Sequence, residues 1–132
     1  MMHVYMDTSA LVKLIVVEPE SSALQDFLNR LPSDGRFTSA LARMELTRAI
    51  ARRGSIEAVA HARRVLAKLD LVPLNSRLLD AAATMMPPEL RSLDAIHLAA
   101  ALTATDLRAI ATYDNRLAEA AATAGLAVAS PR

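Results

Sequence analysis

The chain has 132 residues, of which 53% are hydrophobic and only 3% aromatic, and its net charge is +1 from 15 Lys and Arg against 14 Asp and Glu. This length predicts one domain over residues 1–132 with a mainly aliphatic core. The absence of Cys excludes disulfides and thiolate metal sites, and no apolar run approaches the roughly 18 residues of a membrane span. No leader segment is recognisable, so we expect a cytoplasmic protein.

Strands and helices alternate along the chain. Hydrophobic periodicity predicts strands over residues 4–6, 36–38, 70–74, 108–112 and 126–128. It predicts helices over residues 9–17, 21–31, 40–53, 56–68, 76–86, 91–103 and 115–124. This order is typical of a three-layer α/β fold, with a mainly parallel central sheet of about five short strands and helices on both faces.

Acidic residues follow two of the predicted strands where a helix begins. Asp7 comes directly after the first strand, and Asp114 comes two residues after the strand over 108–112. Open α/β folds bind ligands at the carboxyl edge of the sheet, so these carboxylates indicate a site if their strands are neighbours. Both residues are also good helix N-caps, and capping alone would explain either of them.

Two further acids lie in predicted helices whose first turns could reach the same edge. Glu45 flanks the apolar stripe of its helix, and Asp94 lies in the first turn of the most apolar helix. The ordinary explanations are a solvated Glu45 and a favourable interaction of Asp94 with the helix dipole. We find no basic partner for Asp94 within its own helix, so this carboxylate needs one from elsewhere.

Four carboxylates packed together cannot all stay ionised without a positive counter-charge. A divalent cation is the usual source of that charge, and all-oxygen ligands favour Mg²⁺ or Mn²⁺ over zinc. Such ions can generate hydroxide and stabilise an in-line displacement at phosphorus. The acids therefore indicate metal-dependent hydrolysis of a phosphodiester.

The chain resembles the PIN domain family, and within it the VapC-type toxins of bacterial toxin–antitoxin modules. The resemblance is carried by the stretches at residues 5–11, 39–45, 93–99 and 112–117, in this order. It implies a PIN-like fold and a Mg²⁺- or Mn²⁺-dependent endoribonuclease. The family's acidic pocket matches Asp7, Glu45, Asp94 and Asp114, with Asp7, Asp94 and Asp114 as metal ligands.

The same resemblance assigns supporting roles. Ser9 and Thr112 match positions where the family has a small hydroxyl residue that supports the acids. The Pro87-Pro88 pair departs from the family pattern, so the start of the Asp94 helix is expected to differ. Asp106 is a rival for the fourth acid, but it precedes its strand and should lie at the opposite edge of the sheet.

Arginines gather on the two middle helices, among them Arg43, Arg48 and Arg52. A solvated face and a surface that binds RNA or a partner are both open explanations. His97 lies one helical turn from Asp94, and we expect a packed, hydrogen-bonded histidine rather than a ligand.

The expected partners are an RNA substrate, a second copy of the chain and an antitoxin. The high apolar content suggests more apolar surface than one core can hide, which predicts a homodimer. The resemblance implies a cognate VapB-type antitoxin. We expect the apolar face formed by Leu24, Phe27, Leu28 and Leu31 to help form its groove.

Two other classes of function were weighed. A signalling receiver domain would need an acidic pair after the first strand and a Lys after a late strand, and neither is present. A catalytically silent, PIN-like protein-binding module remains the alternative, although all four acids are in place.

Overall fold

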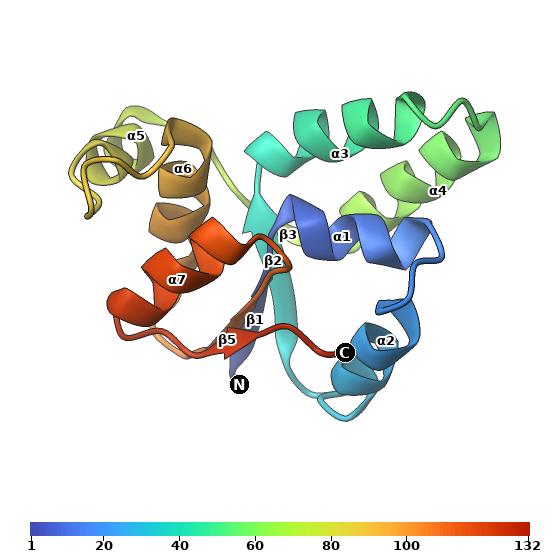
Figure 1. The fold of residues 1–132 in the computed structure, drawn as a ribbon, viewed down its shortest axis with the longest axis horizontal. Coiled ribbons are helices and arrows are strands. Elements are labelled where there is room, and N and C mark those ends of the chain that lie inside the picture. The colour runs from blue at the N-terminus through green and yellow to red at the C-terminus, as the bar shows by residue number, and fades with distance from the viewer.

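The computed structural model describes residues 1–132, and its centre is a five-stranded sheet in which every neighbouring pair is parallel (Figure 1). The strands are β1 (His3–Met6), β2 (Gly35–Ser39), β3 (Asp70–Val72), β4 (Leu107–Ala111) and β5 (Val128–Ala129), in the order β3-β2-β1-β4-β5. The predicted α/β fold is confirmed. β1 and β4 are neighbours, which brings the acids that follow them to one edge.

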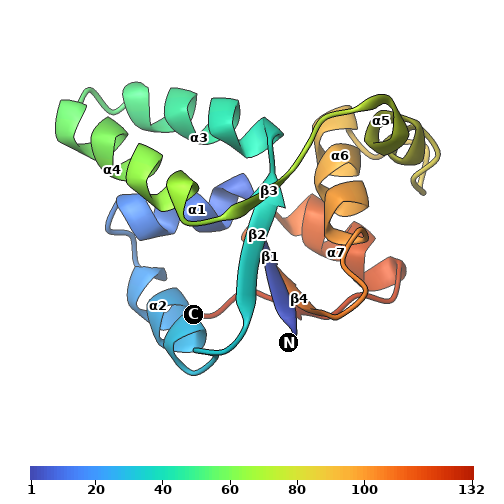
Figure 2. The same ribbon diagram turned by 180° about the vertical axis from the view of Figure 1, so that it is seen from behind.

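Seven helices cover the two faces of the sheet. α1 to α4 lie on one face and α5 to α7 on the other, as Figures 1 and 2 show from opposite sides. The helices are α1 (Thr8–Ile15), α2 (Ser21–Asn29), α3 (Leu41–Ala51), α4 (Ile56–Ala67), α5 (Ser76–Ala83), α6 (Ser92–Ala101) and α7 (Asn115–Thr123). None of them has the length and hydropathy that crossing a bilayer would require.

Both faces of the sheet are buried, which explains why β1 and β4 are apolar at successive positions over Val4–Met6 and Ala109–Ala111. In β1, Val4 and Met6 belong to the core beneath α1 to α4, whereas Tyr5 belongs to the core beneath α5 to α7. All three side chains are fully buried. A strand covered on both faces shows no polar alternation, as is usual in parallel sheets.

Most predicted boundaries differ from the observed ones by one to three residues, and one predicted surface is wrong. α5 ends at Ala83 rather than at residue 86, because Met86 precedes a proline and is disfavoured in helical conformation. β5 lies one to two residues later than predicted. The apolar face of α2 is not a partner groove: Leu24 and Leu28 are buried in the core, so that prediction was wrong.

Candidate active site

Asp7 stands where β1 turns into α1, and its carboxylate is held by hydrogen bonds on both oxygens. Oδ1 accepts from the Ser9 hydroxyl at 2.7 Å and from the Ala10 amide at 2.9 Å, which makes Asp7 the N-cap of α1. Oδ2 accepts from the Thr112 hydroxyl at 2.5 Å. The predicted capping interaction is therefore real, and it also fixes the carboxylate at the carboxyl edge of the sheet.

Thr112 joins Asp7 to Asp114. Its hydroxyl donates to Asp7 and accepts from the Asp114 amide at 3.0 Å. The Asp114 carboxylate caps α7 through the Arg116 amide at 2.9 Å and the Leu117 amide at 3.2 Å. Ser9 and Thr112, the two expected hydroxyl residues, thus both donate to Asp7. Ser9 also accepts from the Tyr113 amide at 2.8 Å, which connects α1 to the loop after β4.

Asp94 is buried in the first turn of α6, and its nearest positive charge comes from Arg91. The Arg91 Nε lies 3.4 Å from Asp94 Oδ2, and its Nη2 lies 3.9 Å from Asp114 Oδ2. Asp94 Oδ2 makes no hydrogen bond, so its contact with Arg91 is electrostatic only. Asp94 was expected to need a basic partner from outside its helix, and Arg91, the residue that precedes α6, is that partner.

Glu45 reaches the site from the second turn of α3 through two donors. Thr8 Oγ1 donates to Glu45 Oε1 at 2.6 Å, and His97 Nε2 lies 2.7 Å from the same oxygen. The other ring nitrogen of His97 lies 2.7 Å from the Tyr5 hydroxyl. His97 is packed and hydrogen-bonded as predicted, but it contacts one of the four acids. Its spacing of three residues from Asp94 on an apolar helix was the available signal.

The carboxylates differ in how readily they ionise. Burial raises the pKa of Asp7 above the ordinary aspartate range, although Thr112 and Ser9 donate to it. Burial also raises the pKa of Asp94, and the charge on Asp114 adds to this effect while Arg91 opposes it. Burial alone would raise the pKa of Glu45, but the hydrogen bonds from His97 and Thr8 outweigh it and the pKa is lowered.

Thr112 and Arg91 link Asp7, Asp94 and Asp114, whereas Glu45 has separate hydrogen bonds to Thr8 and His97, so the four acids are not a closed set of ligands. As the side chains stand, no three His, Asp or Glu groups are positioned to hold a metal ion jointly. The chemistry of the donor set nevertheless fits Mg²⁺ or Mn²⁺: all four are carboxylates, and Asp94 Oδ2 is a buried oxygen without a hydrogen bond. A divalent cation at Asp94 and Asp114 would take the place of the Arg91 guanidinium.

Asp106 lies at the other end of the sheet, as predicted. Its carbonyl accepts from the His3 amide at the start of β1. Arg43 and Arg48 line a groove between α3 and α4 together with Arg63, whereas Arg52 caps the end of α3 and does not line it.

The PIN domain family model matches residues 4–123. The chain therefore belongs to the PIN domain family. Its relatives include two ribonucleases of Mycobacterium tuberculosis, VapC46 (49% identical over 130 residues, 97% of each chain) and VapC35 (49% over 131 residues, 97% of this chain and 96% of that one). VapC47 of the same species is 44% identical over 131 residues, again 97% and 96% of the two chains.

A solved structure has the same fold. The crystal structure of VapC20 of Mycobacterium tuberculosis, described as a toxin that cleaves the sarcin-ricin loop, superposes with a TM-score of 0.75. The superposition covers 97% of this chain and 99% of the VapC20 chain, and the two sequences are 16% identical. At that identity the likeness establishes the fold alone.

Proposed function

We propose that this protein is the toxin of a toxin–antitoxin module and a Mg²⁺- or Mn²⁺-dependent endoribonuclease. The relatives that match almost the full chain are named ribonucleases, which supports RNA as the substrate class. The observation that carries the proposal is the gathering of Asp7, Glu45, Asp94 and Asp114 near one sheet edge, where a buried Asp94 oxygen makes no hydrogen bond.

In this proposal Asp7, Asp94 and Asp114 hold the divalent cation. The bound ion would supply an activated water and neutralise charge that develops on the phosphodiester. Ser9, Ala10 and Thr112 orient the Asp7 carboxylate by the three hydrogen bonds described above. The raised pKa values of Asp7 and Asp94 are what uncompensated burial produces, and a cation would remove that penalty.

Glu45 is assigned to the attacking water. Both of its hydrogen bonds end on Oε1, so Oε2 keeps its lone pairs for a water molecule or a proton. Its lowered pKa keeps it ionised near neutral pH, which suits an acceptor of hydrogen bonds. His97 contacts Glu45 directly and Tyr5 contacts the other ring nitrogen of His97, so both are positioning residues.

We also propose two protein partners. Leu79, Met86, Leu93 and Leu102, on or beside α5 and α6, are each more than 40% exposed, and exposed apolar side chains of this kind favour pairing with a second copy. A VapB-type antitoxin would inhibit the enzyme by placing an Arg among the acids, where carboxylates bind guanidinium groups strongly.

The test is cleavage of total cellular RNA by the purified, antitoxin-free protein in Mn²⁺. The unsubstituted chain should cleave, Asp94→Asn should not, and Asp106→Asn should behave like the unsubstituted chain, because Asp106 lies at the opposite edge of the sheet. Cleavage by Asp94→Asn at the unsubstituted rate would contradict the assignment. A correctly folded, unsubstituted chain that does not cleave would favour the catalytically silent binding module.

A further inference from the structure

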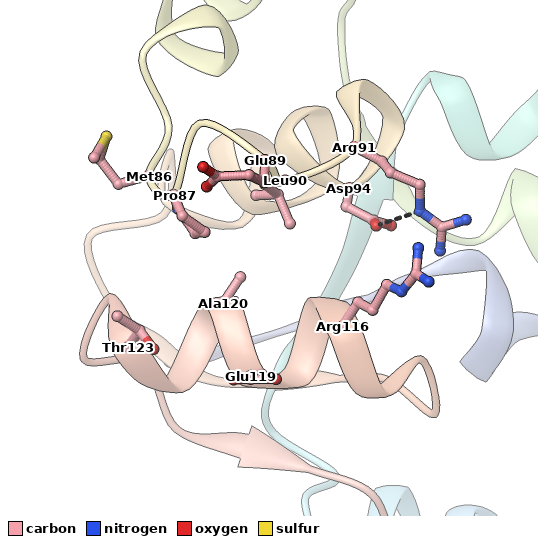
Figure 3. Close-up of a pocket in the computed structure, with 10 residues that line it drawn as sticks. All are labelled: Met86, Pro87, Glu89, Leu90, Arg91, Asp94, Arg116, Glu119, Ala120 and Thr123. Atoms are coloured by element: carbon pink, nitrogen blue, oxygen red, sulfur yellow. Dashed lines mark ion pairs between the residues drawn. The ribbon is translucent and has the colours of Figure 1, made fainter.

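A cavity of about 530 Å³ opens beside Asp94, between the start of α6 and the outer side of α7 (Figure 3). The apolar part of its lining, called here the apolar wall, consists of Met86, Pro87 and Leu90 on the loop before α6 and of Ala120 on α7 opposite them. The volume falls in the range of sites that bind small organic groups, roughly 300–1,000 Å³. Of the four acids, only Asp94 lines this cavity.

Two arginines stand at the end of the cavity nearest the acids. Figure 3 shows the guanidinium groups of Arg91 and Arg116 pointing to the same place beside the Asp94 carboxylate. Arg91 is held loosely, since its contacts with Asp94 and Asp114 are 3.4 and 3.9 Å long and its side chain is 60% exposed. Arg116 makes no ion pair, although its amide is fixed by the Asp114 cap.

The net charge of the cavity lining depends on whether a cation is bound at Asp94. The cavity carries two arginines against three carboxyl groups, Glu89, Asp94 and Glu119. When all five are ionised its net charge is negative, and Arg91 is drawn to the acids. A divalent cation bound at Asp94 would reverse the sign and release the Arg91 guanidinium from its two carboxylate contacts.

We propose that this cavity, the Arg91–Arg116 pocket, is the binding site for the nucleotide next to the cleaved phosphodiester. The two guanidinium groups bind its phosphate, since the planar fork of Arg matches phosphate oxygens. The apolar wall takes the base, as single-stranded RNA is bound through its unstacked bases. This inference rests on the proposed function and adds a subsite to it.

The pocket also couples RNA binding to the metal. Without a cation, Arg91 lies against Asp94 and Asp114, and these carboxylates compete with a phosphate for its guanidinium. With a cation in place, Arg91 joins Arg116. Each ligand therefore favours the binding of the other, and the two effects must be equal in free energy.

The test measures binding rather than cleavage. A fluorescent single-stranded RNA tetranucleotide is titrated with the full-length Glu45→Gln protein by anisotropy, with Mg²⁺ or with EDTA, and gel electrophoresis verifies that the RNA stays intact. Mg²⁺ should raise the affinity about tenfold or more. In Mg²⁺, adding Arg116→Gln should lower the affinity about tenfold and reduce the salt dependence by about one phosphate contact.

Arg30→Gln is the matched control, because Arg30 is an exposed arginine at the end of α2, outside the pocket and outside the groove between α3 and α4. It should leave both affinity and salt dependence unchanged. A tetranucleotide with one abasic position should bind more weakly, which reports on the apolar wall. Arg91→Gln should bind Mn²⁺ several-fold more tightly in calorimetry without RNA, because the competing guanidinium is gone.

The proposal is overturned if Arg116→Gln binds RNA as Arg30→Gln does, or if Mg²⁺ leaves RNA affinity unchanged. It is also overturned if Arg116→Gln weakens only the binding of a protein partner, which would assign the pocket to that partner. RNA cleavage by the unsubstituted chain, combined with any of these results, would leave the proposed function standing and remove the subsite alone.

Discussion

Replacing Thr112 with Val tests whether the hydroxyl that joins Asp7 to Asp114 supports the acids. Val keeps the size of this fully buried side chain and its preference for the end of a strand, but it removes one donor and one acceptor. A hydrogen bond to a charged group contributes about 1.5–3 kcal/mol to stability. The amide of the half-buried Asp114 loses its acceptor as well, but it can donate to water instead. We expect the free energy of unfolding of the metal-free protein to fall by about 2–3 kcal/mol.

Thr112→Val should also lower metal affinity and the rate of RNA cleavage, beyond any loss that comes from reduced stability. Losing a group that orients a metal ligand typically costs about 10–100-fold in metal affinity or activity. The Thr112 hydroxyl lowers the pKa of Asp7, so its removal raises that pKa further and keeps Asp7 protonated to higher pH. The acid limb of the pH–rate profile should therefore move to higher pH.

The measurements are urea unfolding, Mn²⁺ calorimetry and the rate of RNA cleavage between about pH 5 and 8, where maximal stability is usually found. Thr112→Ser is the control, since it keeps the hydroxyl and should retain metal affinity and the pH profile. If Thr112→Val matched Thr112→Ser in both metal affinity and pH profile, the reasoning about the Asp7 carboxylate would be refuted.

Four further predictions follow from the site and the surface. Asp7→Asn and Asp94→Asn should abolish cleavage, and each should raise the free energy of unfolding of the metal-free protein at pH 7. A carboxyl group whose pKa is raised on folding stabilises the folded state below its unfolded pKa, and this contribution is lost as pH rises through its folded pKa. An amide does not ionise, so the Asn variants avoid this loss at pH 7. An unchanged or lower free energy of unfolding in urea would contradict this. Asp114→Asn should keep more activity than either, because Asn is an equally good N-cap for α7 and the side chain is only partly buried, so equal loss in all three would refute the ranking. Light scattering should give a mass of about twice 14.2 kDa, and a mass of 14.2 kDa would exclude the homodimer. Antitoxin inhibition should weaken as Mn²⁺ is raised, and inhibition that is indifferent to Mn²⁺ would rule out an Arg placed among the acids.

The fold was predictable because its strands and acids follow local rules. Each strand of a parallel sheet covered on both faces is a short apolar run, and Asp7 and Asp114 each stand between a strand and a helix. Parallel strands end at the same edge, so the convergence of these two acids followed once β1 and β4 were neighbours. Their capping bonds were predictable from residue type alone.

The partners of the acids could not be predicted in the same way. The contact of Arg91 with Asp114 and that of His97 with Glu45 join residues 23 and 52 positions apart, and only the packing of α6 against its neighbours sets them. The α2 prediction failed for a related reason. An apolar helical stripe such as that of Leu24 and Leu28 has the same sequence pattern whether it faces the core or a partner.

The most direct test of the account is RNA cleavage by one antitoxin-free sample, measured in EDTA and again after Mn²⁺ is added in excess. The account predicts no cleavage in EDTA and full recovery with Mn²⁺, because the edge formed by Asp7, Asp94 and Asp114 supplies carboxylates and no nucleophile of its own. Undiminished cleavage in EDTA would contradict the central claim that these acids act through a divalent cation.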